Sequence, residues 1–173
     1  MHDELVKNHI VKSSIGVFKK LGYEKVTMDH IAKAANKGRT TLYYYFKNKH
    51  EVFELVAELE YLSIIQPAQG VVHSSQSLEK NLRLYNEIKL RSLIDKTNEY
   101  SFLLEDIKQN LNLAYYIFRK LRHIETSIFE NMLTWALEKK EIAPISPEEL
   151  QFLAMTIVTA LNSLEKEMLL YGT

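Results

Sequence analysis

The side chains most suited to chemistry at a surface lie between positions 27 and 51. Arg39 can bond a guanine edge through both prongs of its guanidinium, or hold a phosphate. Thr40 and Thr41 are short enough to bond a base or the backbone, and their methyl groups can touch a thymine methyl. Tyrosine hydroxyls suit phosphate oxygens, which fix register without reading sequence. We therefore expect contacts to double-stranded DNA from Thr27, Arg39, Thr40, Thr41, Tyr43, Tyr44, Tyr45 and Lys49.

Two of these positions also have a purely structural interpretation. The ring of Tyr43 is equally suited to half-buried packing. Lys49 follows Asn48 in a pattern typical of a helix start, with Asn48 as the cap and Glu51 reaching back. The positive end of a helix favours a phosphate beside Lys49, and a solvated lysine is the alternative.

Two short helices with a tight turn between them must position these side chains. Thr27 can cap a helix of about two turns, whose apolar residues recur at helical spacing. The helix stops at Asn36-Lys37-Gly38, because Asn and Gly tolerate the left-handed backbone that ends a helix. A second helix over about 39–46 turns Leu42 and Phe46 inward and leaves a polar, basic outer face. This pattern predicts a helix-turn-helix, in which the second helix enters the major groove.

A longer run, from about residue 10 to residue 53, resembles the DNA-binding domain of the tetracycline-repressor (TetR) family of bacterial transcriptional regulators. The residues that fall at the family's spacing are Ile10, Phe18, Gly22, Tyr23, Val26, Thr27, Ile31, Ala32, Ala35, Thr41, Leu42, Tyr43, Tyr45, Phe46 and Lys49. The departures are Ser13-Ser14, where the family usually has two alanines, and Asn36-Lys37, where it favours Gly-Val. The resemblance covers about the first third of the chain.

The distribution of charge agrees with a DNA-binding head. Net charge is zero over 173 residues, but residues 1–50 carry ten Lys and Arg against four Asp and Glu, a balance of +6, and residues 51–173 carry twelve against eighteen, a balance of −6. The absence of cysteine makes disulfides and thiolate chemistry irrelevant and suits a reducing cytoplasm. No apolar run has the length of a secretory signal or a membrane span.

Helical periodicity predicts an all-α chain of about eight or nine helices. We expect a three-helix helix-turn-helix head over residues 1–48 and a helical effector-binding and dimerisation body over 49–173. Gly22 should end the first helix, and Pro67 with Gly70 should end the fourth. The fourth helix is expected to end near Ile65. The further helices are expected over about 78–95, 99–109, 113–140 and 147–171, with Ser77 capping the first of these and Ser146 and Glu149 forming the capped start of the last.

The last two predicted helices carry more apolar surface than one body can cover. Two such helices from each of two chains would form an intermolecular four-helix bundle, and the resemblance implies the same homodimer. A two-fold dimer in turn implies a palindromic operator. The expected interface residues are Ile124, Ile128, Met132, Trp135, Leu150, Leu153, Ile157, Leu161, Leu164 and Met168.

The resemblance also implies a small-molecule cavity in the body, with ligand binding moving the connector helix to release the operator. Its expected lining is Leu62, Tyr85, Ile88, Phe102, Leu103, Tyr115, Tyr116, Phe118 and Arg119. This makeup suggests a mainly apolar or aromatic effector; the same residues are equally suited to filling the core. The body is about one helix shorter than is usual in the family.

Three function classes follow from these patterns. The first is a ligand-responsive repressor, and the second is a helical DNA-binding protein whose body docks a protein partner and senses no small molecule. The third is an interaction protein that has lost DNA binding. An enzyme is not expected: the six histidines lack metal-site spacing, the five glycines form no phosphate loop, and no nucleophile is paired with a base. Neither a metal nor a cofactor is predicted.

Overall fold

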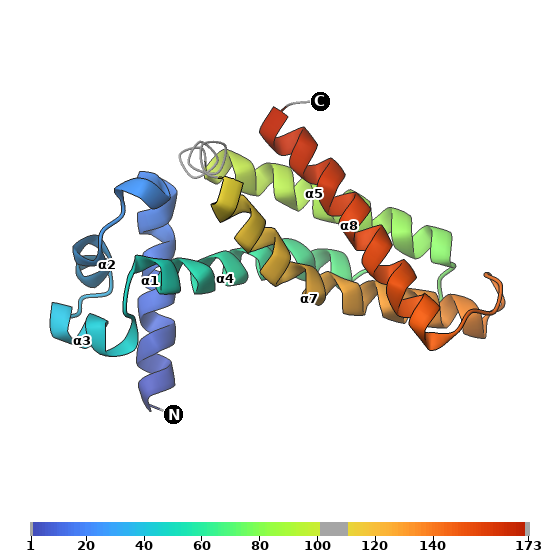
Figure 1. The fold of residues 1–173 in the computed structure, drawn as a ribbon, viewed down its shortest axis with the longest axis horizontal. Coiled ribbons are helices and arrows are strands. Elements are labelled where there is room, and N and C mark those ends of the chain that lie inside the picture. The colour runs from blue at the N-terminus through green and yellow to red at the C-terminus, as the bar shows by residue number, and fades with distance from the viewer. Residues whose placement is uncertain (1, 101–110, 172–173) are drawn as a thin grey trace. The chain divides into compact units, whose positions relative to one another are not determined.

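The described chain consists of helices joined by short turns, as the periodicity predicts. The computed structural model describes the backbone of residues 2–100 and 111–171, and all side chains within these ranges except those of residues 2, 97, 111–121 and 169–171. Seven helices and no strand fall within the described residues (Figure 1). They are α1 (His2–Lys25), α2 (Met28–Ala34), α3 (Arg39–Tyr45), α4 (Lys49–Gln69), α5 (Leu78–Glu99), α7 (Leu111–Glu138) and α8 (Pro147–Tyr171). The predicted all-α class is confirmed; the helix expected over 99–109 lies almost entirely outside the described residues.

Contacts divide the chain into two compact units. Unit 1 contains Met1–Tyr61 and Thr97–Ile117, and unit 2 contains Leu62–Lys96 and Phe118–Thr173. Helices α4, α5 and α7 therefore each contribute to both units. The division into functional domains after residue 48 remains a prediction.

The core of unit 1 joins α1, α2, α3 and the first half of α4 (Figure 1). The ring of Phe53 lies 5.0 Å from that of Phe18 and 4.9 Å from that of Tyr23, in tilted arrangements that aromatic rings favour. Ser14, where the TetR pattern favours alanine, is fully buried and donates its hydroxyl to the Ile10 carbonyl, so its polar group is satisfied within α1.

Local sequence signals place the ends of the short helices. Thr27 caps α2 in a reciprocal pair with His30, whose amide donates to the Thr27 hydroxyl. Asn36 adopts the left-handed backbone (φ 49°) expected in the turn. Gly38 does not: its backbone is extended (φ −69°, ψ 155°), and it precedes α3 as the N-cap.

Gly22 ends the regular part of α1, as predicted, with φ 73° and ψ 177°. Side chains with a Cβ are strained in this region of backbone space. We expect Gly22→Ala to lower the free energy of unfolding of unit 1 by about 1–3 kcal/mol. Urea denaturation measures it, and Gly16→Ala is the matched control, because a Cβ there meets no atom within 4 Å. Equal effects of the two substitutions would contradict a conformational role for Gly22.

One predicted boundary is wrong. Pro67 lies inside α4, which continues to Gln69 instead of ending near Ile65. Proline here falls in the last turn, and the helix still closes behind it, because the Gly70 amide donates to the Gln66 carbonyl at 3.0 Å. The starts of α5 and α8 follow prediction: Ser77 caps α5, and Ser146 forms a capping box with Glu149 before Pro147.

Candidate nucleic-acid interface

Helix α3 turns its apolar side into unit 1 and its polar side outward. Leu42 and Phe46 are buried. Arg39, Thr40 and Thr41 are exposed, and Tyr43 and Tyr44 are exposed at 49% and 75%. Tyr43 is thus exposed over about half of its surface, and its contact with DNA stays a prediction. Five adjacent side chains with guanidinium, hydroxyl and phenol groups thus share one open helical surface.

Tyr45 differs from its neighbours because it is partly buried and already bonded. Its hydroxyl donates to the Asp3 carboxylate at 2.9 Å, which ties α3 to the start of α1. Burial, and then the bond to Asp3, raises the pKa of Tyr45, so the phenol stays protonated at neutral pH. A phosphate contact from this hydroxyl would require exchange of the Asp3 bond.

Arg39 is held by a neighbour in α2. Its Nε lies 2.8 Å from Oδ1 of Asp29, and both side chains are largely exposed. A bond through Nε leaves the two terminal nitrogens of the guanidinium, which are the prongs used in bidentate contacts. Asp29 therefore orients Arg39 at the first turn of α3.

Thr27 lies at the start of α2, with its hydroxyl oxygen accepting the His30 amide at 3.3 Å. The residue is exposed. Because the Thr27 hydroxyl oxygen only accepts in the hydrogen bond from the His30 amide, the hydroxyl proton remains available for a phosphate oxygen.

Lys49 joins α4 to the end of α1. Its Nζ donates to the carbonyls of Tyr23 and Glu24 at 2.8 and 2.9 Å and lies 4.5 Å from the centre of the Tyr23 ring. The Tyr23 hydroxyl lies 3.2 Å from Nδ1 of His50. The ammonium thus has a bracing role in the structure, and a phosphate contact would add to it.

Removing the Lys49 ammonium should therefore have two separate effects. We expect Lys49→Met to destabilise unit 1 by on the order of 1 kcal/mol, because two charge-assisted bonds and a cation–π contact are lost. If the residue also touches a phosphate, binding should weaken for all DNA sequences alike, and the salt slope should fall by about 1. Thermal unfolding and a salt titration of binding measure the two. Lys80→Met, an exposed lysine of α5, is the control; an unchanged salt slope would remove Lys49 from the DNA surface.

A basic, hydroxyl-bearing helix presented by a three-helix head defines a helix-turn-helix DNA-binding protein. Residues 10–56 match the family model described as bacterial regulatory proteins, tetR family. The head, residues 10–56, is therefore a DNA-binding domain of the TetR family of transcriptional regulators.

Relatives extend this likeness beyond the head. The helix-turn-helix transcriptional regulator YhgD of Bacillus subtilis is 23% identical over 159 residues, 90% of this chain and 81% of YhgD. IcaR of Staphylococcus epidermidis, a negative transcriptional regulator of a biofilm operon, is 34% identical over 53 residues, 31% of this chain and 29% of IcaR. A TetR-family regulator from Pectobacterium atrosepticum shares the fold with a TM-score of 0.69 at 18% identity, over 97% of this chain and 83% of that one.

The expected ligand-pocket residues are only partly described. Tyr85 is buried: its hydroxyl donates to Glu125 at 2.7 Å, and its ring meets Phe129 edge-on at 5.2 Å. Leu62 and Ile88 are half-buried. Phe102 and Leu103, and the side chains of Tyr115, Tyr116, Phe118 and Arg119, lie outside the described residues.

A groove of about 620 Å³ lies elsewhere, between the outer sides of α7 and α8. Its lining residues are Arg122, His123, Thr126, Ser127, Glu130, Glu148, Gln151, Phe152 and Met155. Seven of these nine residues are polar or charged, unlike the apolar and aromatic lining expected from the sequence. Sequence reasoning missed these residues because they belong to faces of α7 and α8 that periodicity assigns to solvent.

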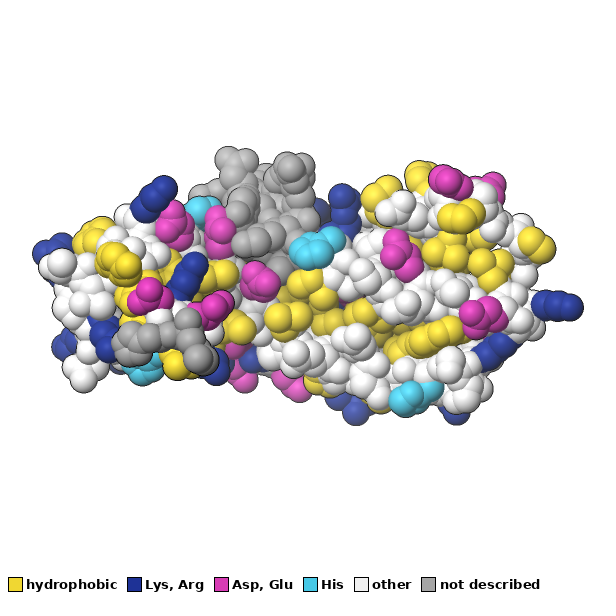
Figure 2. Space-filling view, turned by 90° about the horizontal axis from the view of Figure 1, so that it is seen from below, with side chains coloured by type: hydrophobic (Ala, Val, Ile, Leu, Met, Phe, Trp, Pro, Cys, Tyr) yellow, Lys and Arg dark blue, Asp and Glu magenta, His cyan; other side chains and the backbone are white. Residues whose placement is uncertain are grey.

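The expected dimer residues fall into two groups. Ile128 and Met132 pack inside unit 2, so these two side chains stabilise the protomer instead of facing a partner. Ile124, Trp135, Leu150, Ile157 and Leu161 are half-buried. Leu153, Leu164 and Met168 are exposed at 36%, 61% and 43%. Figure 2 shows hydrophobic side chains gathered on the surface that unit 2 forms.

Asp29 is one of the head residues that sequence reasoning missed. It lies ten positions before Arg39 and on another helix, so no local spacing links the two. An acidic residue in the first turn of a helix is ordinary on its own.

The lengths and polarities of the helices also bear on the predicted absence of a membrane span. Within residues 2–100 and 111–171, no helix is both long enough and apolar enough to cross a bilayer.

Proposed function

We propose that the chain is a cytoplasmic repressor that binds a palindromic operator as a homodimer. The observation that carries the proposal is the open surface of α3, where Arg39, Thr40, Thr41, Tyr43 and Tyr44 are exposed together. Arg39 reads a base edge, the threonines contact a base or the backbone, and the tyrosines hold phosphates. Lys49 and Thr27 flank this surface at the starts of α4 and α2.

Repression is favoured over activation by the relatives of the head. IcaR, which matches the head at 34% identity, is named as a negative regulator. A protein that covers promoter DNA needs no contact with polymerase to repress, so a small head on a dimerising body is sufficient.

The homodimer is supported by the exposed apolar side chains of α8. Leu153, Leu164 and Met168 recur with Ile157 and Leu161 at steps of four and three residues, as in a helix-pairing seam. Large exposed apolar patches usually mark an interaction site. Two copies joined along this seam would present two α3 helices to successive major grooves.

The body is proposed to sense a mainly apolar or aromatic small molecule that releases the operator. Aromatic and apolar residues of α5 and α7 are typical of such a site. The alternative, a body that docks another protein, is favoured by the exposed Phe152, which lines the α7–α8 groove. A thermal-shift screen with apolar metabolites separates the two, because a ligand that binds only the folded state raises the melting temperature.

Selection of bound fragments from random duplex DNA tests the central proposal. We expect the purified chain to enrich a sequence with two inverted half-sites about one helical turn apart. Analytical ultracentrifugation at micromolar concentration should give twice the chain mass. Failure to bind any duplex at low salt would overturn the proposed DNA surface, and a monomeric mass would overturn the dimer.

A further inference from the structure

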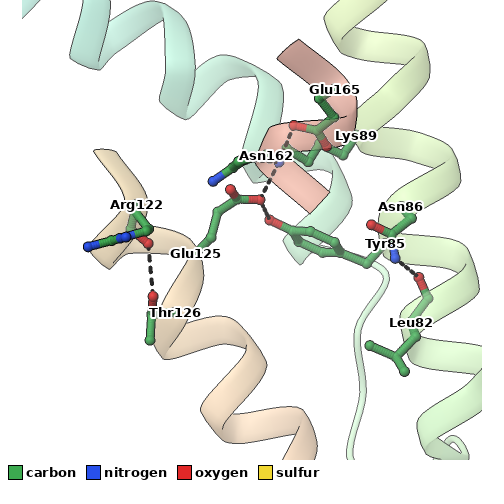
Figure 3. Close-up of polar contacts among 9 residues, drawn as sticks. All are labelled: Leu82, Tyr85, Asn86, Lys89, Arg122, Glu125, Thr126, Asn162 and Glu165. Carbon is green, nitrogen blue, oxygen red and sulfur yellow. Dashed lines mark hydrogen bonds and ion pairs between the residues drawn. The ribbon is translucent and has the colours of Figure 1, made fainter. Parts of the chain in front are cut away.

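A cluster of charged side chains is buried where α5, α7 and α8 meet (Figure 3). Lys89 of α5 and Glu125 of α7 are each 1% exposed, and their Nζ and Oε1 atoms lie 2.7 Å apart. Lys89 Nζ also lies 2.8 Å from Oε2 of Glu165 and 3.1 Å from Oδ1 of Asn162, both on α8. These three contacts match the three N–H groups of an ammonium.

Helix α8 does not turn its most apolar side into unit 2. The buried residues on the face of α8 turned into unit 2 are Ala154, Val158, Asn162 and Glu165, of which two are apolar and two are polar or charged. Its most apolar stripe, Leu153, Ile157, Leu161, Leu164 and Met168, lies at the side and is partly or largely exposed. A helix packed by the hydrophobic effect alone would bury the apolar stripe.

The part of α5 and α7 that α8 covers, called the wall below, contains buried polar groups. Lys89, Glu125 and the Tyr85 hydroxyl belong to α5 and α7, and they are buried beneath α8. If the apolar stripe covered this wall, Lys89 would lose its bonds to Glu165 and Asn162, and the buried charge would be left with fewer partners. Of the two faces of α8, the one with Asn162 and Glu165 supplies acceptors.

We propose that the Lys89 cluster sets the rotation of α8 about its own axis and so keeps the apolar stripe on the surface. Lys89 and Glu165 are positioning residues in this role. The availability of the stripe for a second copy rests on the proposed dimer, but the rotation itself does not. A polar wall thus selects one of two faces of α8, as a buried polar pair selects register in other helical assemblies.

The absence of cysteine from the chain allows a direct test by thiol labelling. Val158 is 1% exposed on the inward face, so the single thiol of Val158→Cys should react slowly in the otherwise unchanged chain. The wall is then made apolar with Tyr85→Phe, Lys89→Met and Glu125→Met. We expect α8 to turn its apolar stripe inward and the thiol at position 158 to react at least tenfold faster.

Three controls keep the outcome specific. The thiol of Leu133→Cys on α7, at another buried position, should stay protected in the apolar-wall variant. Glu87→Met with Arg91→Met removes an exposed ion pair of α5 and should leave the thiol at position 158 protected. Glu165→Gln keeps an acceptor for Lys89 and should also leave the thiol at position 158 protected.

Unchanged protection of the thiol at position 158 behind an apolar wall would overturn the proposed rotation. Fast reaction of the thiols at both positions 158 and 133 would also overturn it, because the cluster would then support the whole unit and not the orientation of α8.

The dimer has its own readout at the apolar stripe. The thiol of Leu164→Cys, in the chain with its wall unmodified, should be protected at high protein concentration and lose protection on dilution. If that thiol reacts equally fast at every concentration, the dimer is contradicted and the rotation still stands.

Discussion

Replacing Arg39 with alanine should relax base preference at one position of each half-site, at a cost of about 1–3 kcal/mol per half-site. The Arg39 side chain is 69% exposed, and Asp29 contacts its Nε, which leaves both terminal nitrogens for a guanine edge. Exposed ion pairs add about 0–1 kcal/mol to stability, so the melting temperature should hardly move. Loss of specificity without loss of stability is the expected signature.

Competition between specific and random duplexes at fixed salt measures this effect. Arg83→Ala removes an exposed arginine from α5 and should leave both affinity and base preference unchanged. Asp29→Asn, which removes the charge that orients the guanidinium, should give a smaller loss at the same base position. An Arg39→Ala protein that keeps full base preference would show that the reading surface lies elsewhere.

The sequence predicted helix boundaries well where the signals are local, in the head and in the body alike. Thr27, Ser77 and Ser146 cap helices as expected, since a cap depends on side chains within three residues. Gly22 adopts a backbone that few other residues tolerate. Helical spacing placed Leu42 in the core and Arg39 outside for the same reason.

Contacts between residues that are far apart in the sequence could not be predicted from local sequence patterns. Lys49 reaches the carbonyls of Tyr23 and Glu24, about 25 positions earlier, and Arg39 reaches Asp29 on another helix. Pro67 was expected to end α4 but lies within its last turn. A proline there removes few of the hydrogen bonds of the helix, so the helix continues past it. Tertiary packing decides each of these cases.

The body shows the limit of periodicity most clearly. A helical stripe on α8 was predicted correctly as a pattern, but periodicity does not say which face of the helix turns inward. That choice depends on Lys89 and Glu125, which lie on other helices and resemble solvated charges when read in sequence. Ile128 and Met132 were assigned to a partner for the same reason, although they pack within unit 2.

Lys89→Met should cause the largest loss of stability among single substitutions of the cluster. It leaves Glu125, which is 1% exposed, and Glu165 without their shared cation. Removing one partner of a buried ion pair costs about 3–5 kcal/mol. Urea denaturation at about pH 7.5 measures the loss, and Glu87→Met with Arg91→Met, which breaks an exposed pair of the same helix, should cost less than about 1 kcal/mol.

The loss caused by Lys89→Met should shrink as the pH falls. Burial raises the pKa of Glu165, and Lys89 opposes part of that rise, so without Lys89 the pKa should rise further. A carboxyl whose pKa is raised by folding contributes stability at low pH, and that contribution is lost as the pH increases through the raised pKa. Denaturation at about pH 5 and about pH 7.5 should therefore show a smaller difference between variant and wild type at the lower pH. An equal loss of stability at both pH values would mean that the carboxylates of Glu125 and Glu165 are hydrated in the variant. Lys89 would then act by filling space more than by its charge.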